Sequence, residues 1–108
     1  RWIRQEGTWR PLNPEAVHSA VSDAGGRPVY LTLDLDVLDP SEFPGTGTPE
    51  PGGARFIDLM ACIAALRRAA APIVGLDVVE LAPRIDPTGA SAIAAAKTVR
   101  ELLLTLPA

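Results

Sequence analysis

One stretch of the chain, residues 31–40 (Leu-Thr-Leu-Asp-Leu-Asp-Val-Leu-Asp-Pro), constrains the fold more than any other. Its almost continuous apolar character is typical of a strand that is buried on both faces of a parallel sheet. Asp34 and Asp36 interrupt it, and a period of two residues predicts that both lie on one face of the strand, about 6.6 Å apart along the chain. Buried carboxylates repel one another unless a positive partner lies between them, so the pattern favours half of a divalent-metal site.

The Asp34–Asp36 pair by itself leaves other interpretations open. An Asp-x-Asp pair also occurs in glycosyltransferases, where it holds a metal and a nucleotide diphosphate, but this chain has no nucleotide-binding feature to support that function. A calcium loop requires acids at positions 1, 3 and 5, Gly at 6 and Glu at 12. Counting from Asp34 places Leu38, Asp39 and Gly45 at positions 5, 6 and 12, so that pattern fails. The remaining alternative is a strand end that leads into an acidic turn at Asp39.

The composition predicts one small domain and excludes several classes of partner. The chain has 108 residues, of which 47% are apolar, and its net charge is −3. This charge gives no basic surface for nucleic acid or a membrane, and we expect no membrane span and no signal peptide. The single cysteine, Cys62, excludes an internal disulfide framework and favours a reducing compartment, so we expect a cytoplasmic protein. The only histidine, His18, lies off the apolar stripe of its predicted helix and is expected to face solvent.

Alternating helix and strand signals predict an α/β fold with a parallel sheet. Residues 13–15 (Asn-Pro-Glu) form a helix start, and residues 25–26 (Gly-Gly) end that helix. The helix that follows the first strand begins with Ala54 and Arg55, neither of which offers a capping hydroxyl. Strand–helix–strand order implies a right-handed crossover between parallel strands. The later elements are predicted as a strand over 28–36, a Pro/Gly/Thr-rich loop over 39–53, a helix over 54–69, a strand over 73–79 and a last helix capped by Thr88 or Ser91.

Four segments around and after the aspartate pair carry a family resemblance. They are residues 33–40, residues 44–49 (Pro-Gly-Thr-Gly-Thr-Pro), the glycines at 52–53, and residues 74–83 (Val-Gly-Leu-Asp-Val-Val-Glu-Leu-Ala-Pro). Together they resemble the metal-binding signature of the ureohydrolases, the family of arginases, agmatinases, guanidinobutyrases and formimidoylglutamases. The Pro-Gly-Thr-Gly-Thr-Pro form is most similar to the agmatinase branch. The resemblance extends over residues 28–104.

This resemblance implies a longer three-layer α/β/α fold with two manganese ions at the strand ends. The family's other ligand blocks, Gly-Gly-Asp-His-Ser and Asp-x-His-x-Asp, are absent from this sequence. We therefore expect residues 1–108 to be a partial ureohydrolase domain, its C-terminal third, that is inactive alone and homo-oligomeric in its full-length form. A fragment, a truncated gene product and one piece of a split protein all fit this expectation, and a non-catalytic remnant is the alternative.

Carried over residue by residue, the resemblance implies a role for each site residue. Asp34 and Asp36 are the expected manganese ligands. Glu80 is expected to pair with the guanidinium of a small substrate in a bidentate hydrogen bond, and Thr48 to support Glu80 or the substrate. Asp77 is expected to be a structural hydrogen-bond acceptor. The implied reaction is hydrolysis of a guanidino group to urea and an amine, with no side chain of these 108 residues in a catalytic role; agmatine, guanidinobutyrate, arginine and formimidoylglutamate are the candidate substrates.

Overall fold

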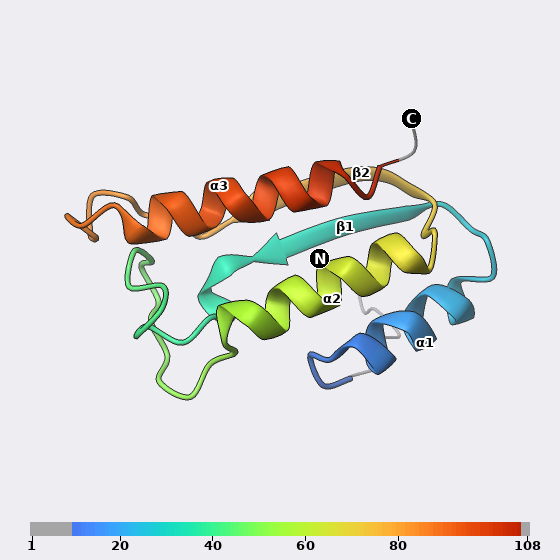
Figure 1. Ribbon diagram of the computed structural model, residues 1–108, viewed down its shortest axis with the longest axis horizontal. Coiled ribbons are helices and arrows are strands. Elements are labelled where there is room, and N and C mark those ends of the chain that lie inside the picture. Colours follow the sequence, from blue (N-terminus) through green and yellow to red (C-terminus); the bar gives the residue numbers. More distant parts are fainter. Residues whose placement is uncertain (1–9, 107–108) are drawn as a thin grey trace, which may run out of the picture.

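The computed structural model describes residues 10–106. In this part of the chain the helices are α1 (Pro14–Ala24), α2 (Phe56–Arg68) and α3 (Ala90–Leu103), and the strands are β1 (Val29–Asp34) and β2 (Ile73–Val79). Helices and strands alternate as the sequence predicts, and β2 has the predicted bounds (Figure 1). Among the described residues, no helix has both the length and the apolar character needed to cross a membrane.

α1 begins and ends where the sequence predicts. The side chain of Asn13 accepts a hydrogen bond from the N–H of Ala16 at 2.8 Å, and Pro14 takes the first helical position. Gly25 ends the helix in the left-handed conformation, with φ of 60°, which a residue without a Cβ adopts at no steric cost. The helix packs against α2 (Figure 1).

β1 and β2 pair in parallel, and their register determines what lies at the strand ends. Asp34, the last residue of β1, is opposite Val79, the last residue of β2. Because both strands run in the same direction and end at the same level, the loops that follow them leave from one edge of the sheet (Figure 1). In open α/β sheets this carboxyl edge is where ligand sites form.

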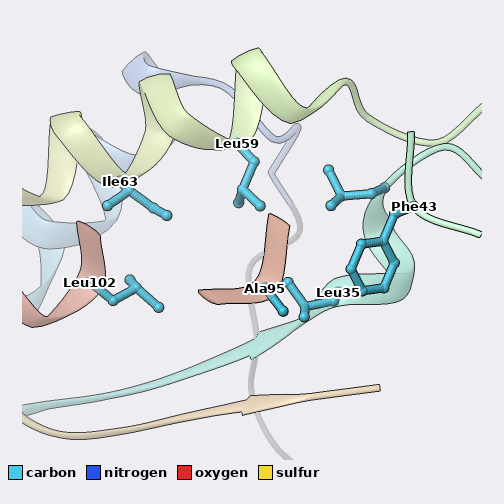
Figure 2. Packing of buried hydrophobic residues seen from close by; sticks show 7 residues of the cluster. Leu35, Phe43, Leu59, Ile63, Ala95 and Leu102 are labelled. Carbon is cyan, nitrogen blue, oxygen red and sulfur yellow. The ribbon is translucent and has the colours of Figure 1, made fainter. Parts of the chain in front are cut away.

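α2 and α3 cover the same face of the sheet. Leu59 and Ile63 of α2 point toward the side chains of α3 above the strands (Figure 2). Phe43, which is fully buried, extends this core beneath the loop that follows β1. The core therefore fixes the loop at the carboxyl edge as well as the helices. The buried residues of the cluster are Leu35, Leu38, Phe43, Leu59, Ile63, Ala95 and Leu102.

No described helix covers the opposite face of the sheet, which carries polar side chains together with the exposed Tyr30. Asp77 accepts hydrogen bonds there from the hydroxyls of Tyr30 at 2.9 Å and Thr32 at 2.6 Å. The prediction that Asp77 is a structural hydrogen-bond acceptor is thereby confirmed. The hydrogen bond from the Tyr30 hydroxyl to Asp77, followed by the negative charge of Asp77, raises the pKa of Tyr30. The prediction that the first strand is buried on both faces is wrong for the described residues, because Tyr30 is 64% exposed.

The start of α2 shows how the missing capping hydroxyl is replaced. Arg55 takes the N-cap position and makes no hydrogen bond from its side chain to the helix. The carboxylate of Glu42, in the loop that follows β1, accepts the hydrogen bond from the N–H of Phe56 instead. A negative charge at this position is also favoured by the helix dipole. The cap of α2 thus comes from a residue outside the helix, and it ties the loop to the helix.

Candidate metal and substrate site

The predicted site residues gather at the carboxyl edge of the sheet. Asp34 ends β1, Asp36 lies two residues later, and Glu80 directly follows β2. The loop that contains Thr48 leaves from the same edge and lies near the start of α3 (Figure 1). The strands therefore bring together two segments that are more than forty residues apart in the sequence.

Asp34 and Asp36 are held by a turn and not by the strand. β1 ends at Asp34, and Leu35–Val37 form a single 3-10 turn. The carboxylate of Asp34 accepts a hydrogen bond from the N–H of Asp36 at 3.1 Å, which caps this turn. The predicted placement of both side chains on one strand face is wrong, because the strand ends at Asp34 and Asp36 lies in the 3-10 turn that follows.

The electrostatics of the pair favour a cation. Partial desolvation raises the pKa of Asp34, and the Asp36 side chain raises it further, while the hydrogen bond from the Asp36 N–H acts in the other direction. The charged form of Asp34 is therefore disfavoured beside Asp36, and a positive ion between the two carboxylates would stabilise it. Asp34 is exposed and Asp36 is half-buried, so both remain accessible to such an ion.

Thr48 orients one of the two carboxylates. Its hydroxyl donates a hydrogen bond to Oδ2 of Asp36 at 2.7 Å. The structure thus places the Thr48 hydroxyl on Asp36, whereas the sequence analysis placed it on Glu80 or the substrate. This contact limits the rotation of the Asp36 side chain and connects the aspartate pair to the Pro44–Pro49 loop.

Glu80 has an unusual backbone conformation. Its φ is 65°, in the left-handed region that a residue with a side chain rarely adopts. The side chain is exposed, and within residues 10–106 its carboxylate makes no hydrogen bond or ion pair. Strain of this kind persists only where the surrounding structure imposes it, and it is commonest at functional positions. Within the part of the chain that the structure describes, the exposed Glu80 carboxylate is accessible to a ligand from solvent.

Asp39 begins the turn that follows β1, since its carbonyl accepts hydrogen bonds from the N–H groups of Glu42 and Phe43. His18 lies on an exposed part of α1, as expected. The carboxylate of Asp39 accepts hydrogen bonds from the N–H groups of Ser41 and Gly52, each at 2.9 Å. These hydrogen bonds, together with one from the Ser41 hydroxyl, lower the pKa of Asp39. Both carboxylate oxygens of Asp39 accept hydrogen bonds from loop residues, so we assign Asp39 to the shape of the loop and not to a metal site.

Sequence reasoning missed Asp86, which is 4% exposed and lies just before α3. Its carboxylate accepts hydrogen bonds from the N–H and hydroxyl groups of both Thr88 and Ser91. Hydrogen bonds from the Thr88 and Ser91 hydroxyls, followed by the Ser91 N–H, hold the pKa of Asp86 far below its ordinary value. The prediction that Thr88 or Ser91 caps this helix is wrong, because Gly89 takes the N-cap position of α3 and Ser91 lies inside the helix. The Thr88 hydroxyl accepts a hydrogen bond from the N–H of Ala90 at 3.2 Å. The Asp-Pro-Thr sequence before a helix was the available signal, since aspartate is a preferred helix cap.

Two carboxylates form only part of a metal centre. Within residues 10–106 there is no group of three or more His, Cys, Asp or Glu side chains that could hold a metal ion. The oxygen donors of Asp34 and Asp36 suit a hard divalent cation such as manganese. The pair therefore fits as a portion of such a centre, and further ligands are needed to complete it.

The chain is similar in sequence to proteins of known families. A profile described as "Arginase family" matches residues 5–105. An agmatinase from Halalkalibacterium halodurans is 49% identical over 79 residues, which cover 73% of this chain and 27% of that protein. A guanidinobutyrase from Pseudomonas aeruginosa is 36% identical over 107 residues, which cover 99% of this chain and 33% of that protein.

Solved structures give the same result for the fold. The structure of proclavaminate amidino hydrolase from Streptomyces clavuligerus superimposes with a TM-score of 0.77 and 36% sequence identity. The match covers 87% of this chain and 32% of that chain. The chain thus spans about a third of the length of the relatives that it matches.

Proposed function

Because this chain belongs to the arginase family, we propose that it forms the C-terminal part of a ureohydrolase domain that hydrolyses a guanidino group to urea and an amine. Agmatine is the proposed substrate, and the support for it is the 49% identity to an agmatinase. The match to a guanidinobutyrase extends over nearly the whole chain, at lower identity, and makes guanidinobutyrate the second candidate.

The observation that carries the proposal is the linked pair at the end of β1. Asp34 and Asp36 would hold manganese through their carboxylate oxygens, and Thr48 would keep the Asp36 carboxylate oriented through its 2.7 Å hydrogen bond. Outer hydrogen bonds of this kind fix the orientation of metal ligands and influence affinity. The chemistry that a pair of such ions supplies when bound is a lowered pKa for water, and hence hydroxide near neutral pH.

Glu80 is the proposed partner of the substrate. A carboxylate accepts two parallel hydrogen bonds from a guanidinium, which holds this planar group in one orientation. The left-handed backbone of Glu80 directs the chain away from β2 immediately after the strand, and its exposed carboxylate has no other partner within residues 10–106. Orientation of the guanidinium next to the nucleophile would lower the entropic barrier to attack.

Homo-oligomeric assembly and a cytoplasmic location are further parts of the proposal. Exposed apolar side chains on α3, among them Ile93 at 72% and Leu103 at 54%, support assembly because such groups are stabilised by burial. The single cysteine, Cys62, is buried and unpaired within the described residues, as is usual in a reducing compartment. Light scattering on the full-length protein would test the assembly.

The function can be tested with the full-length protein in the presence of manganese. We expect urea release from agmatine above that from guanidinobutyrate or arginine, with consumption of formimidoylglutamate measured in parallel. Asp36→Asn should abolish turnover because it removes a charged ligand of similar size. Glu50→Gln is the matched control, since Glu50 is an exposed acid in the same loop. A wild-type protein that hydrolyses none of the four compounds would refute the proposal and favour a non-catalytic remnant.

A further inference from the structure

We propose that Asp86 and Ser91 are positioning residues that hold the Pro44–Pro49 loop and thereby orient Asp36 toward its metal. The inference rests on the proposed function, because it assigns a purpose to the orientation of Asp36. Neither residue belongs to the aspartate pair or to the segment around Glu80. Both are almost completely buried, with 4% and 0% of their surface exposed.

The contacts between α3 and the loop have a defined direction. The hydroxyl of Ser91 donates to Oδ2 of Asp86 at 2.7 Å, and the N–H of Ser91 donates to the same oxygen at 2.8 Å. With its proton committed to Asp86, the Ser91 oxygen accepts the hydrogen bond from the N–H of Gly45 at 2.8 Å. The hydrogen bond from the Ser91 N–H to Asp86 is enough to satisfy the start of the helix. The hydrogen bond between the Ser91 hydroxyl and Gly45 is additional, and it holds the Pro44–Pro49 loop.

Gly45 is fixed from its other side as well. Its carbonyl accepts a hydrogen bond from the N–H of Ala82 at 2.7 Å, two residues after Glu80. A Cβ at Gly45 would lie 2.6 Å from the Cβ of Ser91 and 3.1 Å from the Cβ of Asp86. The loop therefore lies in close contact with the start of α3. Through Gly45, the Asp86–Ser91 pair is connected both to the segment of Glu80 and to the loop of Thr48.

The series of contacts that begins at Asp86 and Ser91 reaches Asp36, the proposed metal ligand, through Thr48. Thr48 lies three residues after Gly45 and donates to Asp36 at 2.7 Å. A short loop that is fixed at Gly45 has little freedom at Thr48, so the position of its hydroxyl depends on the Ser91 contact. Loss of the Ser91 hydroxyl should release the loop and allow Asp36 to rotate away from its metal-binding orientation.

The test uses the full-length protein and compares Ser91→Ala with Thr98→Ala. Thr98 is a matched control because its buried hydroxyl also lies on α3 but donates to the carbonyl of Ala94 in the same helix. Ser91→Ala should weaken manganese affinity about 10-fold, the lower end of the usual effect of removing an outer hydrogen bond. Amide hydrogen exchange at Gly45 and Ala82 should accelerate about 10-fold or more relative to exchange in α2.

Thr98→Ala should leave manganese affinity within about twofold of the wild type and should change exchange at Gly45 no more than in α2. Asp86→Asn keeps one acceptor for Ser91, so its manganese affinity should lie between the wild type and Ser91→Ala. Equal manganese affinity in wild-type protein and Ser91→Ala, or equal losses in Ser91→Ala and Thr98→Ala, would overturn the positioning role alone. Wild-type protein that binds no manganese would refute the proposed function itself, which is a separate result.

Discussion

The substitution Gly45→Ala tests the close contact between the Pro44–Pro49 loop and α3. The added Cβ would lie 2.6 Å from the Cβ of Ser91 and 2.8 Å from its Oγ. Carbon atoms in contact prefer a separation of about 3.5–4.0 Å, so the loop and the helix must separate by about 1 Å. That movement lengthens the hydrogen bond from the Gly45 N–H to Ser91, now 2.8 Å, to about 3.8 Å, which is beyond hydrogen-bond range.

The cost in free energy of unfolding has two sources. Overpacking of this size costs about 1–3 kcal/mol. The unpaired, buried N–H of Gly45 costs about 1–3 kcal/mol more. Because one movement causes both, the terms are not independent, and we expect a total of about 2–4 kcal/mol. Turnover should fall about 100-fold if the loop positions the site, since a displacement of about 1 Å has an effect of this order.

Denaturant unfolding and urea release on the full-length protein measure both effects. Gly47→Ala is the control, because a Cβ at Gly47 meets no atom within 4 Å and Gly47 does not have a positive φ. It should change the free energy of unfolding by no more than about 0.5 kcal/mol and leave turnover near the wild-type value. If Gly45→Ala behaves like Gly47→Ala in both assays, the proposed contact between the loop and α3 does not control the site.

Three further predictions address other parts of the structure. The pKa of Asp86 is lowered from its ordinary value of 3.8, so its hydrogen bonds stabilise the fold above about pH 4, and this stabilisation is lost as the pH falls further. The melting temperature of Asp86→Asn should therefore lie below that of the wild type at pH 7. A difference in melting temperature that stays constant down to pH 2 would contradict this. Glu80→Gln keeps the size of the side chain but loses the charge that pairs with guanidinium. Metal analysis should therefore find normal manganese, while steady-state kinetics should show weaker substrate binding and lower turnover. Loss of manganese would instead make Glu80 a metal ligand or the direct support of one. The 108-residue chain alone, with manganese, should release no urea from agmatine. In sedimentation experiments it should self-associate through exposed side chains such as Tyr30 and Val74. Metal-dependent turnover by a monomer with a sharp melting transition would contradict both expectations.

Much of the fold could be predicted because its signals are local. The Asn13 cap and Gly25 define α1, and the apolar run between Pro72 and Glu80 defines β2. The α/β class and the family resemblance are also confirmed. They could be predicted because a short motif such as Pro-Gly-Thr-Gly-Thr-Pro is contiguous in the sequence.

The missed features depend on contacts between distant residues. Period-two reasoning placed Asp36 on the strand, but the strand ends two residues earlier, at Asp34, and the chain continues in a 3-10 turn. The hydrogen bond that caps α2 is accepted by Glu42, which lies fourteen residues before Phe56, the residue whose N–H donates it. Ser91 contacts Gly45 across forty-six residues. Such partners are determined by tertiary packing, which residue spacing along the chain does not encode.

The manganese content of the full-length protein shows whether Asp34 and Asp36 are metal ligands. Elemental analysis should compare the wild type with Asp34→Asn, Asp36→Asn and the Glu50→Gln control after equilibration with the same concentration of manganese. We expect manganese per chain to fall in each aspartate variant and to remain at the wild-type level in Glu50→Gln. Wild-type manganese content in both aspartate variants would show that the pair at the end of β1 is not a metal site.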